Sequence, residues 1–102
     1  MHEAIDQHRE AIFELCRRFY VRRLDVFGSV TTDAFDPNRS DVDFLVEFWD
    51  DMPIRRFNAY FQLKDQLEQL LERKVDLIEP GGVRNDYYRR GIDSTLEHLY
   101  AA

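Results

Sequence analysis

Three aspartates in two separate segments have the spacing expected of a carboxylate group that binds metal. Asp41 and Asp43 stand two residues apart at the head of the apolar segment Val42–Phe48, and Asp76 lies inside a later apolar segment. Side chains two residues apart on a β-strand point to the same side, so Asp41 and Asp43 are predicted to project together. Convergent carboxylates repel one another unless a cation lies between them, and Mg²⁺, which prefers oxygen ligands, suits such a group.

Such a group is suited to phosphoryl transfer. Two Mg²⁺ ions about 3.5–4 Å apart stabilise both the attacking and the leaving oxygens of a phosphoryl displacement. Asp41 and Asp43 are the expected ligands of these ions. Asp76 is expected to ligate the ion nearer an acceptor hydroxyl and to help deprotonate that hydroxyl.

A Gly-Ser pair precedes the first two aspartates and could supply neutral donors to a nucleoside triphosphate. Gly28 lets the backbone approach a phosphate because it has no Cβ. The hydroxyl and N–H of Ser29 can then donate to the phosphate, aided by a helical turn that starts there. Ser40, directly before Asp41, is also expected to face the nucleotide, although a turn or cap role is the simpler explanation for this serine.

The periodicity of apolar residues predicts the elements that must position these residues. Apolar residues at helical spacing predict helices over residues 4–19 and 54–72. Tyr88, Ile92, Leu96 and Leu99 predict a C-terminal helix. Strands are predicted over three segments, separated by turn-forming residues: Arg23–Phe27, Val42–Phe48 and Lys74–Ile78.

This order of elements predicts an α+β fold of one domain over residues 1–102, with helices packed on one face of a short mixed sheet. In the middle strand, Val42, Phe44 and Val46 alternate with the aspartates and belong under the helices. The carboxylates, including Asp76 from the third strand, are therefore expected on the opposite face, where the active site would lie.

Composition excludes several classes of protein. A formal net charge of −6 argues against a nucleic-acid groove, which needs an excess of Lys and Arg on one face. No apolar segment approaches the roughly 20 residues of a bilayer span, and the amphipathic, acidic N-terminus does not read as a signal peptide. The single cysteine, Cys16, shares a helical face with apolar residues, so a buried inert thiol in a reducing cytoplasm is expected.

The motifs together resemble the minimal nucleotidyltransferase (MNT) family of the DNA polymerase β-like superfamily. The resemblance spans nearly the whole chain and rests on Gly28-Ser29, on the segment from Ser40 to Phe48, and on Val75-Asp76-Leu77-Ile78. It implies Gly28 and Ser29 at the triphosphate, Asp41 and Asp43 as metal ligands, and Asp76 as the third carboxylate.

The resemblance also implies a partner. Members of this size are similar to the antitoxin half of a two-gene pair whose toxin is a HEPN-type ribonuclease. The implied reaction is transfer of AMP from ATP to a tyrosine hydroxyl of the toxin within a hetero-oligomer, with no direct contact to nucleic acid or membrane. One segment departs from the family pattern, since many members have Ala-Arg-Gly where this chain has Thr31-Thr32-Asp33. Arg39, Arg89 or Arg90 could supply the missing cation.

Two other functions are compatible with these residues. The chain could be a non-catalytic antitoxin that blocks its partner sterically, as the altered Thr31-Thr32-Asp33 segment would allow. It could also transfer a nucleotide to a small molecule such as an aminoglycoside, although such enzymes usually add a helical domain that closes the acceptor site.

Overall fold

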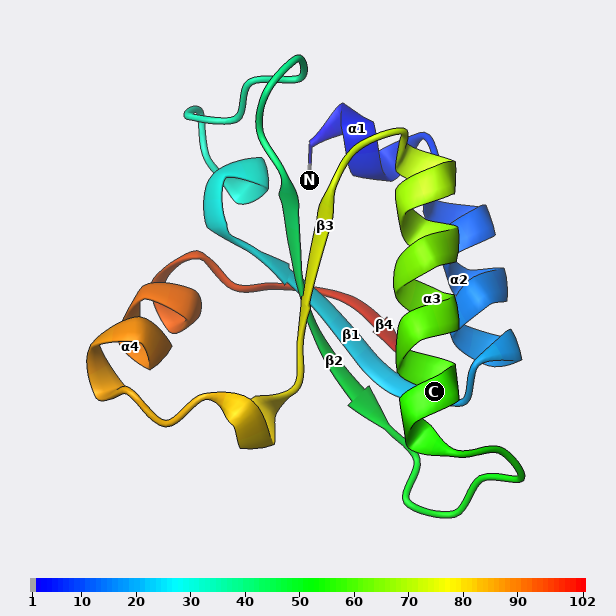
Figure 1. Ribbon diagram of the computed structural model, residues 1–102. Helices are drawn as coiled ribbons and strands as arrows, with labels where there is room; N and C mark the ends of the chain where they lie inside the picture. Colours follow the sequence, from blue (N-terminus) through cyan, green and yellow to red (C-terminus); the bar gives the residue numbers. More distant parts are fainter. Residues whose placement is uncertain (1) are drawn as a thin grey trace.

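The computed structural model describes residues 2–102 as a four-stranded sheet with helices on both sides (Figure 1). The elements, in chain order, are α1 (Glu3–Asp6), α2 (Arg9–Arg18), β1 (Val21–Phe27), the 3₁₀ helix η1 (Gly28–Thr31), β2 (Val42–Phe48), α3 (Arg56–Leu71), β3 (Val75–Ile78), the 3₁₀ helix η2 (Pro80–Gly82), α4 (Asp86–Thr95) and β4 (Glu97–Ala101).

The sheet has the strand order β3-β2-β1-β4 and is mixed. β1 pairs antiparallel with both β2 and β4, whereas β2 and β3 run parallel. In this register Phe27 lies opposite Asp43, and Asp43 lies opposite Asp76. The predicted α+β class with a short mixed sheet is therefore confirmed.

The main hydrophobic core lies between the sheet and helices α2 and α3, which cover one face (Figure 1). β2 shows the alternation that the sequence predicts, because its even-numbered residues are buried while Asp43, Leu45 and Glu47 are half-buried. The buried residues of β2 are Val42, Phe44, Val46 and Phe48. Their contact with the helices leaves the aspartate side chains on the other face.

The second face is partly covered by α4. Phe27, Val83 and Ile92 form a small buried cluster there, against which three half-buried residues pack: Leu45, Ile78 and Leu96. Helix α4 thus sits beside the residues that follow β1, on the opposite side of the sheet from α2 and α3 (Figure 1). It does not close over the carboxylates, since Asp43 is half-buried and Asp76 is exposed.

Two helix predictions need correction. The segment 4–19 is not one helix, because Gln7 and His8 form a turn between α1 and α2. The prediction that Leu96 and Leu99 continue the C-terminal helix is wrong, since α4 ends at Thr95 and β4 follows. Their three-residue spacing resembles a helix, yet Leu96 packs in the α4 cluster and Leu99 in the main core. Pairing with the free edge of β1 stabilises the strand instead.

Two further expectations concern the rest of the chain. Cys16 is fully buried, as predicted, and burial raises the pKa of its thiol to about 12, so the thiol stays protonated. Within residues 2–102, no helix has both the length and the apolar character needed to cross a bilayer.

Candidate active site

Asp43 and Asp76 lie side by side on the second face of the sheet. They are register partners on the parallel strands β2 and β3, each the second residue of its strand. Asp43 is half-buried and Asp76 is exposed, so the pair forms the floor of an open site rather than a closed pocket.

Gly28 lies directly against Asp43. β1 ends at Phe27, opposite Asp43, and Gly28 turns away from the sheet with a φ of +77°. A Cβ on Gly28 would stand 2.3 Å from Oδ2 of Asp43, far inside van der Waals contact. The sequence predicts glycine here so that the backbone can approach a phosphate, but the structure adds a second reason, which is room for the Asp43 carboxylate.

The electrostatics of the site follow from this crowding. The pKa of Asp43 is raised to about 6, first by burial and then by the hydrogen bond to Asp76 and the charges of Asp76 and Asp41. Asp41 and Asp76 therefore both act on Asp43. Without a cation the group is strained electrostatically, and a divalent ion would relieve that repulsion.

Asp41 lies one residue before β2 and is half-buried. Across residues 2–102, no group of three or more His, Cys, Asp or Glu side chains is close enough to hold a metal ion by itself. Asp41, Asp43 and Asp76 thus do not form a preformed three-ligand cage. Their oxygen chemistry still fits Mg²⁺, which keeps several waters and usually binds through one or two carboxylates together with substrate phosphates.

The two serines differ in their surroundings. The Ser29 hydroxyl makes no hydrogen bond within the described part of the chain, so it is available to a ligand. The Ser40 hydroxyl instead accepts a hydrogen bond from the Asp36 N–H at 2.9 Å, and the Ser40 N–H donates to the Asp36 carbonyl at 2.8 Å. Ser40 therefore closes the loop before β2, which favours the turn interpretation over nucleotide contact.

The cations that could replace the missing arginine are not equivalent. Arg89 donates to the carbonyl oxygens of Pro80 and Val83 at 3.3 and 3.2 Å, so it holds η2 to α4. The side chains of Arg39 and Arg90 have no hydrogen-bond or ion-pair partner within the described residues. Arg73, which the sequence did not single out, donates to the Ser40 carbonyl oxygen at 3.3 Å and so lies near Asp41.

A second acidic group on the same face has a structural role. Asp25 of β1 is 2% exposed and bonds Nε of Arg23 at 3.0 Å and Nδ1 of His98 at 2.8 Å. Its carboxylate is satisfied by these partners and joins β1 to β4. It is therefore a less suitable metal ligand than Asp43.

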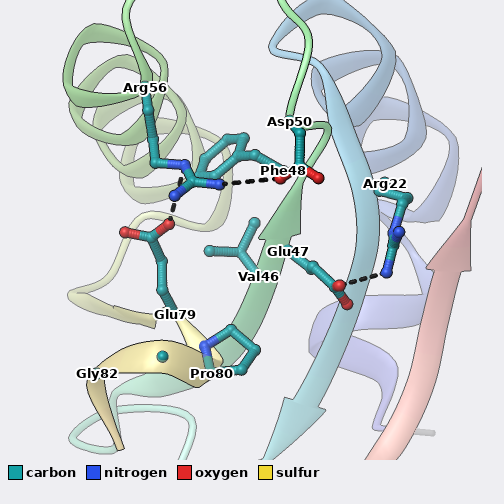
Figure 2. A pocket seen from close by; sticks show the side chains of 10 residues that line it. Arg22, Val46, Glu47, Phe48, Asp50, Arg56, Glu79, Pro80 and Gly82 are labelled. Atoms are coloured by element: carbon teal, nitrogen blue, oxygen red, sulfur yellow. Dashed lines mark hydrogen bonds and ion pairs between the residues drawn. The ribbon is translucent and has the colours of Figure 1, made fainter.

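The hollow in Figure 2 lies at the opposite ends of β2 and β3 from the aspartates. Its volume is about 400 Å³, and the charged side chains that line it are joined in ion pairs. Arg22 pairs with Glu47, and Arg56 pairs with Glu79 at 3.5 Å and with Asp50 at 3.9 Å. Size alone does not make it the active site, because it contains neither the coupled carboxylates nor the Gly28 turn.

The raised pKa of Asp43 predicts a pH-dependent gain in stability on replacing it. When folding raises the pKa of a carboxyl group from about 4 to about 6, the free energy of unfolding of the protein falls as pH rises through that range. Asp43→Asn should therefore raise the free energy of unfolding of the metal-free protein by about 1 kcal/mol at pH 7, after allowance for solvent screening of a half-exposed group. Urea denaturation of wild type and Asp43→Asn, in the presence of a metal chelator and from pH 4 to 8, measures this difference in the free energy of unfolding.

The gain should vanish near pH 4, where the native carboxyl group is protonated. Asp93→Asn makes the same chemical change on α4, away from the three aspartates, and should show no such pH dependence. An equal gain for Asp43→Asn at every pH would contradict the proposed repulsion.

Comparison with known proteins identifies relatives of this arrangement. The sequence profile named nucleotidyltransferase domain matches residues 8–99. A Methanocaldococcus jannaschii protein, named as a candidate protein adenylyltransferase, is 31% identical over 97 residues, which cover 95% of this chain and 92% of the relative. A second such protein from the same organism is 30% identical with the same coverage.

Solved structures show the same fold. A candidate minimal nucleotidyltransferase superposes with a TM-score of 0.74 at 32% identity, covering 95% of both chains. A Shewanella oneidensis complex of a tri-AMPylated HEPN toxin with an MNT antitoxin superposes with a TM-score of 0.64, covering 95% of this chain and 72% of the other. At 18% identity, this second likeness concerns the fold alone.

Proposed function

Because this chain belongs to the nucleotidyltransferase domain family, we propose that it transfers AMP from ATP to a tyrosine hydroxyl of a partner HEPN-type ribonuclease toxin and thereby silences the toxin. The observation that carries the proposal is the apposition of Asp43 and Asp76, with the Gly28 backbone against Asp43 and the charge of Asp41 acting on it.

Asp41, Asp43 and Asp76 would hold the Mg²⁺ ions, and two ions are expected. Bound Mg²⁺ would neutralise these carboxylates and stabilise the charge that develops on the phosphate oxygens. The raised pKa of Asp43 supports this assignment, because burial and the two neighbouring carboxylates disfavour its anion, and a bound cation would stabilise that anion.

The chain's own residues position the ATP. η1 starts at Gly28, and the Ser29 hydroxyl is available there as a donor to a phosphate oxygen. A hydrogen bond to a charged acceptor is worth about 1.5–3 kcal/mol, so this one hydroxyl can contribute measurably to nucleotide affinity. Because η1 adjoins Asp43, a triphosphate on Ser29 would lie beside the carboxylates.

Asp76 would act on the acceptor. In the proposed step the tyrosine oxygen forms a bond to the α-phosphorus of ATP, and the bond from that phosphorus to the bridging oxygen breaks. Pyrophosphate leaves, and the phenol proton passes to Asp76. A tyrosine hydroxyl with a pKa near 10 is a poor nucleophile at neutral pH, which is why a carboxylate beside it is useful.

Three observations support a protein acceptor. The Methanocaldococcus relatives are named as candidate protein adenylyltransferases. The fold is shared with an MNT antitoxin bound to a tri-AMPylated HEPN toxin. The surface also exposes aromatic side chains suited to a protein contact, including Phe57 (69% exposed) and Tyr87 (82% exposed). We expect both proteins to act in the cytoplasm, where ATP is available.

Label transfer tests the reaction. The partner is sought as a small helical protein encoded by the neighbouring gene, with an Arg-x(4–6)-His motif. With Mg²⁺ and ATP labelled in the α-phosphate, wild type should label the partner on tyrosine, whereas γ-labelled ATP should leave it unlabelled. The double variant Asp41→Asn, Asp43→Asn should bind the partner without labelling it.

Other results would favour the alternatives. A partner that is bound and inhibited but never labelled would indicate a steric antitoxin. Label found on an aminoglycoside rather than on protein would indicate a small-molecule transferase.

A further inference from the structure

Two hydrogen bonds tie η1 to the last residue of α4. The Gly28 N–H donates to Oγ1 of Thr95 at 2.8 Å, and Oγ1 of Thr31 donates to the Thr95 carbonyl oxygen at 2.7 Å. Residues 28 and 95 are 67 positions apart in the sequence, so this contact is purely tertiary. Both ends of η1 are thus fixed to a single threonine.

The contact gives a structural role to Thr31, which has no role in the candidate active site described above. Thr31 belongs to the Thr31-Thr32-Asp33 segment, and its hydroxyl is the group that reaches Thr95. The same contact occupies the N–H of Gly28, which is therefore not free to donate to a phosphate. Ser29, between the two bonded residues, keeps its hydroxyl available.

Val30 anchors the middle of η1, because its side chain is buried in the main hydrophobic core. The ends of this four-residue 3₁₀ helix depend on hydrogen bonds instead, and short 3₁₀ helices have poor internal hydrogen-bond geometry. The bonds to Thr95 therefore matter most at Gly28 and Thr31. Gly28 lies against Asp43, so η1 adjoins the central carboxylate, which is itself held by β2.

We propose that Thr31 and Thr95 are positioning residues, which hold the Gly28-Ser29 turn in the shape that binds Mg-ATP. The proposal rests on the proposed nucleotide site, but it concerns residues that touch neither the nucleotide nor a metal ligand. Loss of one bond should weaken Mg-ATP binding while leaving the carboxylates in place. The rate of AMP transfer at saturating Mg-ATP should therefore change little.

The chain offers matched variants. Thr95→Ala removes the acceptor for Gly28, and Thr95→Ser keeps a hydroxyl at the same place. Ser94→Ala is the control, because the Ser94 hydroxyl donates to the Gly91 carbonyl oxygen at 2.9 Å, inside α4, and does not reach η1. Thr31→Val keeps the shape of the side chain and removes both contacts of its hydroxyl, the one to the Thr95 carbonyl oxygen at 2.7 Å and the one to the Gly28 carbonyl oxygen at 3.0 Å. It therefore tests the proposal even if Thr95→Ala folds poorly.

Isothermal titration of each full-length variant with Mg-ATP is the measurement, followed by transfer rates at saturating Mg-ATP. We expect Thr95→Ala and Thr31→Val to weaken binding by about threefold to tenfold, the range for one neutral hydrogen bond. Thr95→Ser and Ser94→Ala should bind within about twofold of wild type, and saturated rates should stay within about twofold for all variants.

Three results would overturn the proposal. Wild-type affinity in both Thr95→Ala and Thr31→Val would do so, as would equal weakening by Ser94→Ala. If wild type itself fails to bind Mg-ATP, the proposed nucleotide site falls together with this inference. If wild type binds and the variants match it, only the positioning role is lost.

Discussion

Gly28→Ala is expected to reduce AMP transfer by about 100-fold or more, the loss that about 1 Å of misplacement can cause. The added Cβ would lie 2.3 Å from Oδ2 of Asp43, so one of the two groups must move. The carboxylate is the more mobile group, because it can rotate about its side-chain torsions. The substitution should therefore displace Asp43 from its place opposite Asp76.

The cost in stability should be smaller than the cost in activity. A φ of +77° strains an alanine by roughly 1–2 kcal/mol, and the protein should still fold. Gly91→Ala is the matched control: an added Cβ meets nothing within 4 Å, and alanine favours the helix by about 0.5–1 kcal/mol. Transfer rates and melting temperatures of both variants are the measurements. A wild-type rate in Gly28→Ala would contradict the proposed site.

β2 shows why part of the fold could be predicted from the sequence. Its alternation of buried and half-buried residues is complete over seven residues, although Leu45 interrupts the apolar and polar pattern, and the predicted bounds Val42–Phe48 are those observed. Local alternation also predicted that Asp43 and Asp76 face the same side. Their direct pairing depends on the parallel register of β2 and β3, which the sequence alone does not determine.

β4 shows what the sequence could not indicate. Its residues pair with β1, more than 70 positions earlier in the chain, and the spacing of Leu96 and Leu99 resembles a helix. The second, smaller core under α4 is equally non-local, since its buried residues come from β1, the segment after η2 and α4. Each depends on a tertiary contact that outweighs local preference.

The site was predictable in its residue types and less so in its contacts. Gly28, Asp43 and Asp76 stand out in the sequence by type and spacing. The close approach of Gly28 to Asp43 and the hydrogen bonds to Thr95 cannot be predicted in this way, because they join positions that no periodic pattern relates. A threonine at the end of a helix carries no sequence signal that distinguishes it from an ordinary helix terminus.

Asp76→Asn is expected to reduce AMP transfer by about 10³-fold, within the range for loss of a general base and metal ligand. Asparagine has nearly the same volume, and the backbone pairing of β3 does not involve the side chain. Because Asp76 is exposed, folding should persist. Removing its charge also relieves Asp43, whose pKa the Asp76 carboxylate raises.

The Asp76→Asn variant should still bind the partner protein. Asp43 and Gly28 are unchanged in Asp76→Asn, and so are the exposed aromatic side chains on α3 and α4 that suit a partner contact. Co-purification of the two proteins is therefore expected for wild type and variant alike. Asp93→Asn, an exposed aspartate of α4, is the control for a general effect of charge.

Intact-mass spectrometry of the purified partner, after incubation with Mg-ATP and each variant, tests the central claim most directly. We predict that wild type and Asp93→Asn add the mass of AMP to the partner, and that Asp76→Asn binds the partner but adds none. If wild type suppresses the partner without any added mass, the protein is a steric antitoxin; if Asp76→Asn adds AMP at the wild-type rate, Asp76 is a structural residue and the proposed mechanism is wrong.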